Sequence, residues 1–395
     1  MGEGFVSIFK KAWTNQKTLA FKLNVKEYRG MKTQDRIQSM LSEGVKDGVY
    51  PGAVLLVAQE GRVEFLREAG HRLLTPHTEP IHKDTIFDLA SLTKPLATTL
   101  AIMKLVDQGD LHLDETLMAL LPGPMPGEKR FLTPRLLLAH SAGFPDWKPL
   151  YLALDSIAPQ KKKAVLRERL LNMPLAYTPG KETVYSDLGF MLLEWIVEVR
   201  AGVPMHLFLD QHFYGPLVLK RTFLCHKSLK NRFKEAEFAA TEDCPWRKRT
   251  VIRDVHDENA YAVGGYSGHA GLFGTAKEVY TLVNVLRGHF FEERSDYLKP
   301  ETVRKFFTLQ GLVAGSTWAL GWDTPSPENS SSGKYFSKKS VGHLGFTGTS
   351  IWIDLERDVM VIFLTNRIHP TRNNEKIKAF RPRLHDLLME ELGII

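Results

Sequence analysis

The sequence predicts an α/β (α+β) protein in which an antiparallel sheet is flanked by helices and carries an all-helical subdomain. Strand-like segments occur near both ends of the chain, whereas the middle alternates helical runs with proline-rich turns. Two candidate hairpins favour antiparallel pairing, because hairpin loops are too short for a parallel crossover. We expect an N-terminal extension over 1–31 and one domain over 32–395, with an α/β part at 32–112 and 255–395 and a helical insertion at 113–254.

The first third of the chain predicts the order helix, hairpin, helix. Apolar residues recur at helical spacing over residues 33–49, and Gly48 provides an end. Two apolar runs in 52–70 flank Gln59-Glu60-Gly61-Arg62, which is typical of a β-hairpin. Residues 91–109 have a helical pattern that Gly109 can terminate.

The rest of the chain supplies the insertion and the second half of the sheet. Helical patterns cover residues 164–173 and 188–202 of the middle region. Residues 342–366 contain two strand-like runs across a turn at Glu356-Arg357, and residues 373–392 predict a terminal helix.

Composition favours a soluble globular protein over a nucleic-acid or membrane protein. The chain has 395 residues and a formal net charge of +7, but its basic residues are spread out and its basic runs lack interleaved aromatic residues. Cys225 and Cys244 have no metal-binding spacing and suggest reduced thiols. No segment reaches the roughly 18 apolar residues of a membrane helix, and the N-terminus lacks the features of a signal peptide. We therefore expect a cytoplasmic protein without a membrane span.

The stretch Ala139-His140-Ser141-Ala142-Gly143 approximates the nucleophile elbow G-x-S-x-G of α/β-hydrolases. An elbow serine needs a helix directly after it, but Pro145 and Pro149 follow within a few residues. The alternative is a helix that begins at Thr133-Pro134 and is capped at Gly143. We expect the second arrangement, in which Ser141 is structural.

A second serine has a better setting for nucleophilic chemistry. Ser91-Leu92-Thr93-Lys94 is an S-x-x-K motif, and residues three apart on a helix share a face. Pro95 places Ser91 at a helix start, where the helix dipole favours negative charge. A serine hydroxyl needs a nearby base and a positive field, and this arrangement can supply both. The same pattern at Ser7 and at Ser331 falls in segments that we interpret as loose.

Two further motifs follow in order along the chain. Tyr185-Ser186-Asp187 stands just before a helical run, and His343-Leu344-Gly345 lies in a strand-like segment with a glycine that lets a substrate approach the backbone. With the S-x-x-K motif, the sequence resembles the serine β-lactamase and penicillin-binding-protein superfamily, class C branch. Its members carry S-x-x-K, Y-x-N and K-T-G in this order. The stretch 133–143 also resembles a leucine-rich packing motif of these relatives.

The resemblance implies a β-lactamase/transpeptidase-like fold from about residue 34 to the C-terminus, and a role for each matched residue. Ser91 would form the acyl-enzyme, Lys94 would share its proton and keep the site positive, and Tyr185 would be the general base and acid. The backbone N–H groups of Ser91 and Phe346 would form the oxyanion hole. A tyrosine needs positive neighbours to serve near neutral pH, and whether Tyr185 or Lys94 takes the first proton stays open.

The motifs depart from those of β-lactamases at two positions. Asp187 stands where lactamases usually have Asn, and His343 stands where their Lys-Thr-Gly lysine helps to hold the substrate carboxylate. A histidine is mostly neutral at pH 7, so both changes weaken the case for an anionic β-lactam. We expect Asp187, His343 and Gly345 in the substrate-binding site; a strand-edge His343 bonded to backbone is the alternative.

A glycine-rich stretch at 255–279 carries His256 and His269. It has no H-E-x-x-H pattern or close ligand pair, so we expect no metal. The stretch resembles a segment of peptidoglycan-linked members of the superfamily, which implies a cleft wall lined or braced by both histidines. Trp147 and Tyr177 are further candidates for the acyl pocket.

Taken together, the motifs predict a serine hydrolase without a cofactor that cleaves a small ester or amide through an acyl-enzyme. Muramyl-peptide amides and small carboxylic esters are the candidate substrates. A β-lactamase or D-Ala-D-Ala carboxypeptidase is the first alternative, and a non-catalytic penicillin-recognising or scaffold protein is the second. The sequence leaves the oligomeric state open.

Overall fold

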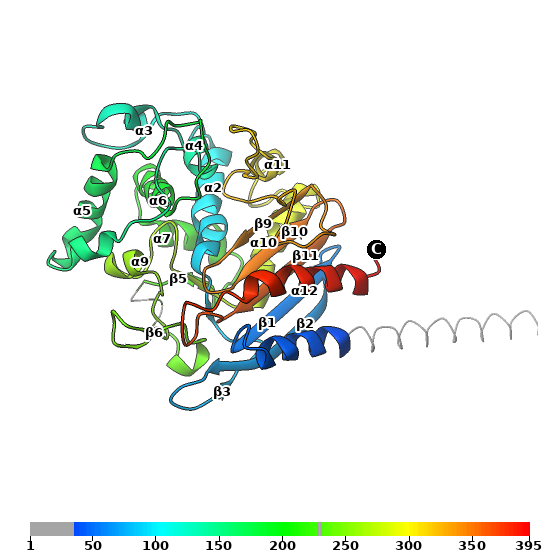
Figure 1. The fold of residues 1–395 in the computed structure, drawn as a ribbon. Coiled ribbons are helices and arrows are strands. Elements are labelled where there is room, and N and C mark those ends of the chain that lie inside the picture. Colours follow the sequence, from blue (N-terminus) through cyan, green and yellow to red (C-terminus); the bar gives the residue numbers. More distant parts are fainter. Residues whose placement is uncertain (1–34, 227–228, 230) are drawn as a thin grey trace, which may run out of the picture.

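A computed structural model describes residues 35–226, 229 and 231–395 of the chain. The predicted extension at 1–31 lies outside these residues. Figure 1 shows the sheet and its covering helices at one end of the molecule, and the helices of the insertion at the other.

Strands from both ends of the chain form one antiparallel sheet of six strands, in the order β3-β2-β1-β11-β10-β9. The N-terminal hairpin meets the C-terminal strands where β1 pairs with β11, with Leu55 opposite Phe363. The bounds are Gly52–Gln59 for β1, Arg62–Leu73 for β2, Glu79–Pro80 for β3, Ser340–Leu344 for β9, Ser350–Asp354 for β10 and Val359–Thr365 for β11. The predicted antiparallel sheet from both chain ends is confirmed.

Helices cover both faces of this sheet, because every central strand is apolar on both sides. Along β1, Leu55 packs with a helix at residues 35–46 and with α12 (Ile377–Glu391), whereas Leu56 on the opposite face packs with α2 (Leu100–Gln108) and α10 (Ala276–Phe290). In Figure 1, α12 and the N-terminal helix lie side by side on their face of the sheet. The core therefore has two layers, and the active-site segment joins the α2 side.

The insertion contains helices and also three short strands. Its helical elements are α3 (Leu117–Leu120), η3 (Gly127–Phe131), α4 (Pro134–Leu138), η4 (Leu150–Leu154), α5 (Pro159–Asn172), α6 (Asp187–Ala201), α7 (Met205–Leu209) and η5 (Asp210–Tyr214). Strands then resume earlier than the predicted residue 255, as β5 (Phe223–Leu224), β6 (Asp243–Cys244) and β7 (Arg249–Thr250). Because β5 pairs with β8 (Leu272–Gly274), the region is not all-helical.

Several predicted boundaries change in the structure. The helix expected over 91–109 consists of a 3₁₀ turn η1 (Ala90–Leu92), a π-helical turn η2 (Lys94–Thr99) and α2, which Gly109 ends with φ +84°. The helix expected over 133–143 begins at Thr133-Pro134 as predicted but ends at Ala139, because His140 has a positive φ of 54°. In the C-terminal half, β9 precedes the two predicted strands, and α12 begins at residue 377.

The remaining described elements are β4 (Phe87–Asp88), η6 (Glu235–Glu237), α9 (Glu258–Ala262) and α11 (Pro300–Phe307). Among the described residues, no helix is both long and apolar enough to cross a membrane. Cys225 and Cys244 are both buried and are not joined by a disulfide.

Candidate active site

Ser91 lies in a tight turn between β4 and the helical turns that follow. Ala90 has a positive φ of 48°, which turns the chain sharply in front of the serine. The carboxylate of Asp88 holds this turn, because its Oδ1 accepts the N–H of Ala90 at 2.8 Å and its Oδ2 accepts the N–H of His256 at 2.7 Å. The serine is thus presented at the end of a fixed turn and lines a cavity.

Lys94 is fully buried behind Ser91 and forms the positive centre of the site. Its Nζ donates to Ser91 Oγ at 3.0 Å, to Asp187 Oδ1 at 2.6 Å and to the carbonyl of His269 at 3.4 Å. Burial lowers the pKa of Lys94, but the charges of Asp187 and Tyr185 outweigh it and raise the net pKa above the usual value. The lysine therefore stays an ammonium group at neutral pH.

Tyr185 directly precedes the Ser186 N-cap of α6, and its ring lies across Lys94. Lys94 Nζ is 4.7 Å from the ring centroid, and 37% of the tyrosine residue is exposed. Burial of the phenol group raises the pKa of Tyr185, whereas the charge of Lys94 lowers it. Because Asp187 also raises this pKa, the net value lies above that of a free tyrosine. The predicted trio of Ser91, Lys94 and Tyr185 is brought together.

Ser141, in contrast, is fully buried and donates to the carbonyl of Ala139 at 3.1 Å. Its neighbour His140 makes the contacts through which this stretch supports the active site. His140 Nδ1 accepts the N–H of Ser186 at 3.0 Å, and its ring packs 4.7 Å from that of Tyr185. The stretch positions the tyrosine from behind, as expected for a packing motif, and Tyr177 contributes by donating its hydroxyl to the His140 carbonyl at 3.0 Å.

The end of β9 closes the cleft opposite Tyr185. A Cβ at Gly345 would lie 2.0 Å from Thr349 Oγ1 and 2.7 Å from the carbonyl of Leu89, so only glycine fits here. Thr349 Oγ1 also donates to this Leu89 carbonyl at 3.1 Å, which ties the strand end to the segment before Ser91. Phe346 follows in the cavity wall, with its ring stacked 5.7 Å from that of His256.

His343 lines the cavity although only 3% of it is exposed. Its Nδ1–H donates to the carbonyl of Leu344 at 2.8 Å, and burial lowers the pKa of His343 to about 3. His343 is thus bonded to backbone, and it also faces the cleft as a neutral ring where β-lactamases have a lysine. Its part in substrate binding stays a prediction.

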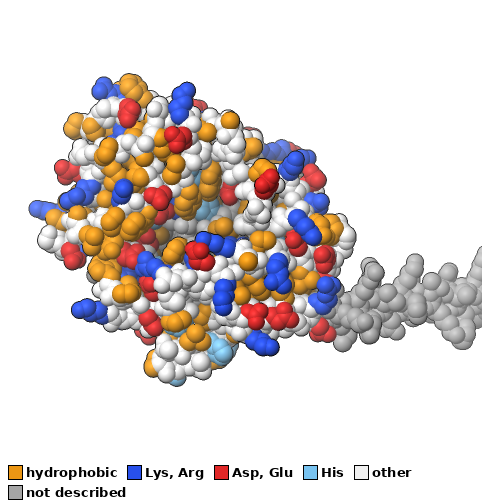
Figure 2. Space-filling view, in the orientation of Figure 1, with side chains coloured by type: hydrophobic (Ala, Val, Ile, Leu, Met, Phe, Trp, Pro, Cys, Tyr) orange, Lys and Arg blue, Asp and Glu red, His pale blue; other side chains and the backbone are white. Residues whose placement is uncertain are grey.

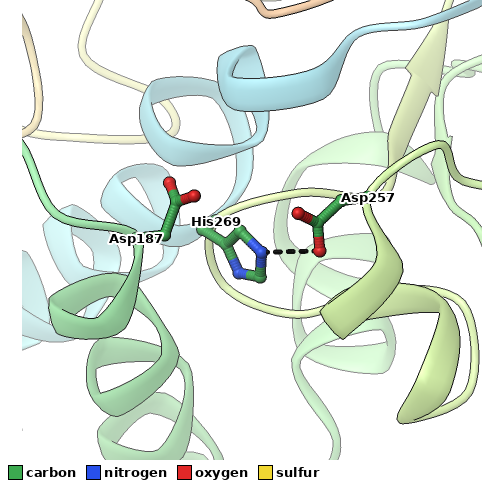
Figure 3. A group of neighbouring side chains, drawn as sticks. All are labelled: Asp187, Asp257 and His269. Carbon is green, nitrogen blue, oxygen red and sulfur yellow. Dashed lines mark hydrogen bonds and ion pairs between the residues drawn. The ribbon is translucent and has the colours of Figure 1, made fainter. Parts of the chain in front are cut away.

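A second buried pair lies beside Asp187 (Figure 3). His269 Nε2 is 2.9 Å from Asp257 Oδ1. Burial lowers the pKa of His269, but Asp257 and then Asp187 raise it to a net value above normal, while the histidine brings the pKa of Asp257 down to about 2. Basic and acidic side chains therefore alternate along the floor of the site, in the order Lys94, Asp187, His269 and Asp257.

One potential metal-ligand group coincides with this pair. Ligand-type atoms of Asp187, Asp257 and His269 lie within 4.8 Å of one another. Asp187 already binds the Lys94 ammonium, and Asp257 and His269 bind each other. A metal ion would have to displace these partners, so the absence of a metal stays our prediction.

These residues surround a cavity of about 600 Å³. In Figure 2 the molecule is hollowed near the centre of the face shown, where hydrophobic side chains border a histidine. Trp147 lies at the wall and is 38% exposed. The lining comprises Asp88, Ala90, Ser91, Asp146, Trp147, Tyr185, Asp187, His256, Asp257, Glu258, His269, Ala270, Trp318, Asp323, His343, Leu344, Gly345, Phe346 and Arg372. Carboxylates outnumber cationic side chains, and aromatic rings form much of the rest.

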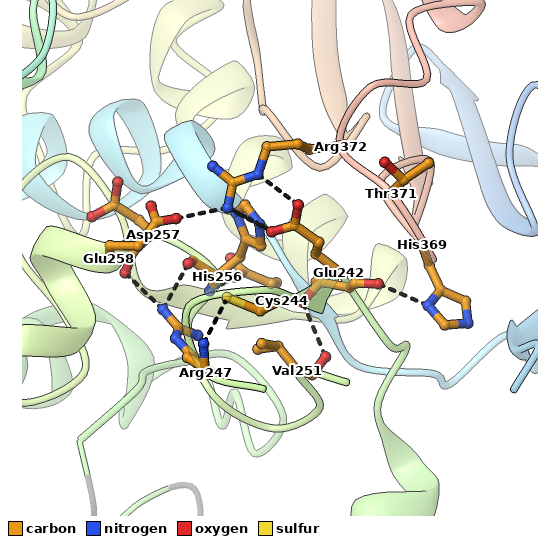
Figure 4. A network of polar contacts seen from close by, with 12 residues as sticks. Glu242, Cys244, Arg247, Val251, His256, Asp257, Glu258, His369, Thr371 and Arg372 are labelled. Carbon is orange, nitrogen blue, oxygen red and sulfur yellow. Dashed lines mark hydrogen bonds and ion pairs between the residues drawn. The ribbon is translucent and has the colours of Figure 1, made fainter. Parts of the chain in front are cut away.

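A polar network supports one wall of the cavity (Figure 4). Arg372 binds Glu242 through Nε at 2.7 Å and Glu258 through Nη2 at 2.6 Å, and His256 Nε2 is 3.0 Å from Glu242 Oε2. Burial raises the pKa of Glu242, but its bonds to His256 and Arg372 dominate and bring it to about 2. The network fixes His256, whose ring supports Phe346.

Sequence reasoning missed several lining residues, and the three that matter most below are Trp318, Asp323 and Arg372. Each comes from a segment without regular secondary structure, so no periodicity marks it. Trp318 lies with its ring stacked 5.6 Å from that of Tyr185, and Asp323 is next to β9. Only a Trp-rich run at 318–322 could have drawn attention to this segment.

Comparison with known families identifies the family of the chain. The family model described as Beta-lactamase matches residues 37–382. The chain belongs to the beta-lactamase family. It is therefore a serine hydrolase that acts on an ester or amide bond, and the fold and superfamily expected from the three motifs are confirmed.

Curated relatives and solved structures agree with this family. The N-acetylmuramyl-L-alanine amidase of Bacillus subtilis (strain 168) is 33% identical over 365 residues, with 85% of this chain and 81% of the relative covered. A putative D-alanyl-D-alanine carboxypeptidase of Escherichia coli (strain K12) is 31% identical, with 85% of this chain and 82% of the relative covered.

Solved structures share the fold. The hydrolase EstCE1 has a TM-score of 0.69 and 22% identity, with 89% of this chain and 99% of the other covered. The octameric penicillin-binding protein homologue from Pyrococcus abyssi has a TM-score of 0.67, 21% identity and coverage of 91% and 77%.

Proposed function

We propose that this beta-lactamase-family protein hydrolyses the amide bond between a muramyl acyl group and L-alanine, and that Ser91 forms the acyl-enzyme. The contact between Ser91 Oγ and the buried Lys94 ammonium, at the base of a large cavity, carries the proposal. The relative named N-acetylmuramyl-L-alanine amidase supports the choice of bond. The buried thiols and the absence of a spanning helix in the described residues fit a cytoplasmic site of action.

In the first half of the reaction, Ser91 Oγ attacks the carbonyl carbon and transfers its proton to the oxygen of a deprotonated Tyr185, a phenolate that the Lys94 ammonium stabilises. The N–H groups of Ser91 and Phe346 hold the resulting oxyanion; each such donor contributes about 10²–10³ in rate. When the C–N bond breaks, Tyr185 returns the proton to the leaving amine. The acyl group then remains as an ester on Ser91.

In the second half, Tyr185 takes a proton from water, and the water oxygen attacks the ester. Ser91 leaves with the proton that Tyr185 returns, which regenerates the enzyme and releases the carboxylic acid. Lys94 remains an ammonium throughout, because Asp187 stabilises its charged form. It stabilises the negative charge that passes between Ser91 and Tyr185.

The size and character of the cavity suit a muramyl group. A volume of about 600 Å³ exceeds the need of an acetyl ester, and aromatic rings with surrounding carboxylates provide apolar faces and acceptors for a hydroxylated ring. Asp187, His269 and Trp147 would contact this substrate from the floor and one wall, and His343 with Gly345 from the β9 side.

The identity of the nucleophile is tested by intact mass after incubation with a fluorophosphonate probe. Wild type and Ser141→Ala should gain one adduct, and Ser91→Ala should gain none. Labelling of Ser91→Ala together with loss of labelling in Ser141→Ala would reverse the assignment of the nucleophile. A wild type that does not label would favour a non-catalytic binding protein.

The substrate is tested by turnover of muramyl-L-alanine beside an acyl-D-Ala-D-Ala peptide, a β-lactam and phenyl acetate. We expect kcat/KM for muramyl-L-alanine to exceed that for the D-Ala-D-Ala peptide, with no turnover by Ser91→Ala. The reverse order would favour a carboxypeptidase, which is the name of the relative at 31% identity. Turnover of the aryl ester alone would favour a carboxylesterase.

A further inference from the structure

Beside β9 the cavity has a corner that takes no part in the proposed bond cleavage, although His343 in this corner would contact the substrate. Trp318, Asp323 and His343 all line it. The rings of Trp318 and His343 lie 5.7 Å apart, and Trp318 stacks on Tyr185. We call these three residues the β9 corner. The β9 corner therefore lies next to Tyr185, but its side chains are of other types than those of the catalytic trio.

Asp323 is fixed in this corner by its own backbone and by one carboxylate oxygen. Its N–H donates to the carbonyl of Gly342 at 2.8 Å, and the N–H of Gly342 donates back at 2.9 Å, which aligns the segment with the edge of the sheet. Its Oδ1 accepts the Thr317 hydroxyl at 2.6 Å and the N–H of Thr324 at 2.9 Å. The carboxylate cannot rotate without losing both hydrogen bonds, so its position is fixed before a ligand binds.

No cation neutralises Asp323 within the described part of the chain. Burial raises its pKa to about 6, and only the bonds from Thr317 and Thr324 act in the opposite direction. Asp187 and Asp257 on the cavity floor, in contrast, are paired with Lys94 and His269. Asp323 Oδ2 therefore remains available to a ligand.

His343 adds a second acceptor to the corner. Because its Nδ1–H donates to the Leu344 carbonyl, its Nε2 carries a lone pair. This nitrogen is buried and has no hydrogen-bond partner among the described residues. An acceptor left in this state is costly unless a bound donor satisfies it.

We propose that Asp323, with His343 and Trp318, is a specificity determinant that accepts substrate groups with hydrogen-bond donors and rejects groups with a carboxylate. The proposal rests on the proposed function only in taking Ser91 as the nucleophile. A carboxylate at this corner would face Asp323 and the negative face of the Trp318 ring, whereas a hydroxyl or an ammonium group would satisfy both acceptors. On a muramyl amide, the sugar hydroxyls rather than a free carboxylate would lie here.

Matched aryl esters test this selectivity without any peptide substrate. The series is phenyl acetate with a 3-hydroxymethyl, 3-aminomethyl or 3-carboxymethyl substituent, and the unsubstituted ester as reference. The same substituents are placed on the acyl side, as phenyl esters of 3-substituted phenylacetic acids, so that either end of the substrate can reach the corner. The ratio of kcat/KM values within a series is the readout.

In wild type we expect the donor-bearing esters to exceed the carboxylate ester by about tenfold or more in at least one series. Asp323→Asn should reduce this ratio severalfold, and Asp323→Lys should invert it. Asp146→Asn, which removes a carboxylate from another part of the same cavity, should keep the ratio. The hydroxymethyl and aminomethyl esters separate a preference for neutral donors from one for cations.

Equal ratios in wild type and in both Asp323 variants would overturn the proposal, as would an equal effect of Asp146→Asn, which would indicate general charge repulsion. These outcomes differ from failure of the proposed function. If Ser91 is not the nucleophile, Ser91→Ala hydrolyses the esters as wild type does. If the substrate is not a muramyl amide, the ester ratios are unaffected.

Discussion

The Nζ of Lys94 lies 2.6 Å from Oδ1 of Asp187, and this contact sets the electrostatics of the site. The carboxylate raises the pKa values of both Lys94 and Tyr185. An asparagine, the usual residue at this position in β-lactamases, would accept the same hydrogen bond without the charge. Lys94 and Tyr185 therefore hold their protons more tightly than they would beside an uncharged asparagine.

Asp187→Asn should move the pH dependence of kcat/KM towards lower pH. In wild type we expect activity to rise with pH as Tyr185 loses its proton, and the raised pKa of Tyr185 places this rise on the alkaline side. Removing the Asp187 charge lowers that pKa, so the rise should shift down by about one pH unit or more. Ester hydrolysis between about pH 7 and 11 measures the shift, with Asp146→Asn as the control; coincident profiles would contradict the proposed role of Asp187.

Gly345→Ala should abolish most activity while the protein still folds. The new Cβ would collide with the Leu89 carbonyl, which is backbone and cannot rotate away. The strand end and the Phe346 N–H would move away from Ser91, and loss of one oxyanion donor typically lowers kcat by about 10²–10³. Kinetics with phenyl acetate measure the loss, and circular dichroism checks the fold. Full activity would show that the Phe346 N–H is not used.

His140→Ala should destabilise the protein more than Ser141→Ala. The histidine is buried against Tyr185 and accepts the Ser186 N–H, so its removal leaves a cavity and an unpaired donor. We expect a loss of about 2–4 kcal/mol in the free energy of unfolding, against about 1 kcal/mol for the Ser141 hydroxyl. Urea denaturation at pH 7 measures both. Equal losses would mean that His140 does not support the tyrosine.

Asp323→Asn should stabilise the protein at neutral pH. The pKa of Asp323 is about 6 in the folded protein and about 3.9 in an unfolded chain. The folded state therefore binds the proton more tightly, and stability is lost as pH rises from about 4 to 6. Because the side chain is partly exposed, we expect Asp323→Asn to add about 1–2 kcal/mol at pH 7.5 and nothing at pH 4.

Urea denaturation across this pH range measures the effect, and Asp354 provides the opposite control. Burial raises the pKa of Asp354, but hydrogen bonds from Ser337 and the N–H groups of Arg357 and Glu356 outweigh it and lower the net pKa. Asp354→Asn should therefore destabilise at pH 7.5, and its effect should shrink as the pH falls. If Asp323→Asn instead lowers the free energy of unfolding at pH 7.5, the charged Asp323 carboxylate does not destabilise the folded protein.

The sequence predicted the parts of the site that depend on local spacing. Ser91 and Lys94 are three residues apart across the turns η1 and η2, and Tyr185 and Asp187 flank the Ser186 N-cap of α6, so local spacing brings each pair together. Ser141 could be set aside because Pro145 and Pro149 exclude the helix that an elbow requires. The antiparallel sheet followed from the alternating apolar segments at both chain ends.

Trp318 and Asp323 could not be predicted, because long-range contacts alone bring them to the cavity. Their segment has no period, and it reaches β9 through the backbone bonds between Asp323 and Gly342. The helix boundary at Ala139 was missed for a related reason. His140 takes a positive φ so that its ring can support Tyr185, and this tertiary contact overrides the local preference for a stop at Gly143.

The pairing of β1 with β11 has a consequence for the synthesis of the protein. The N-terminal hairpin leaves the ribosome early, but its partner strand is made only about three hundred residues later. Until then one long strand edge has no partner, and β9, which forms one wall of the cleft, does not yet exist. A nascent chain that already contains Ser91, Lys94 and Tyr185 therefore still lacks the wall that His343, Gly345 and Phe346 provide. The complete cleft forms only after the C-terminal strands have joined the sheet.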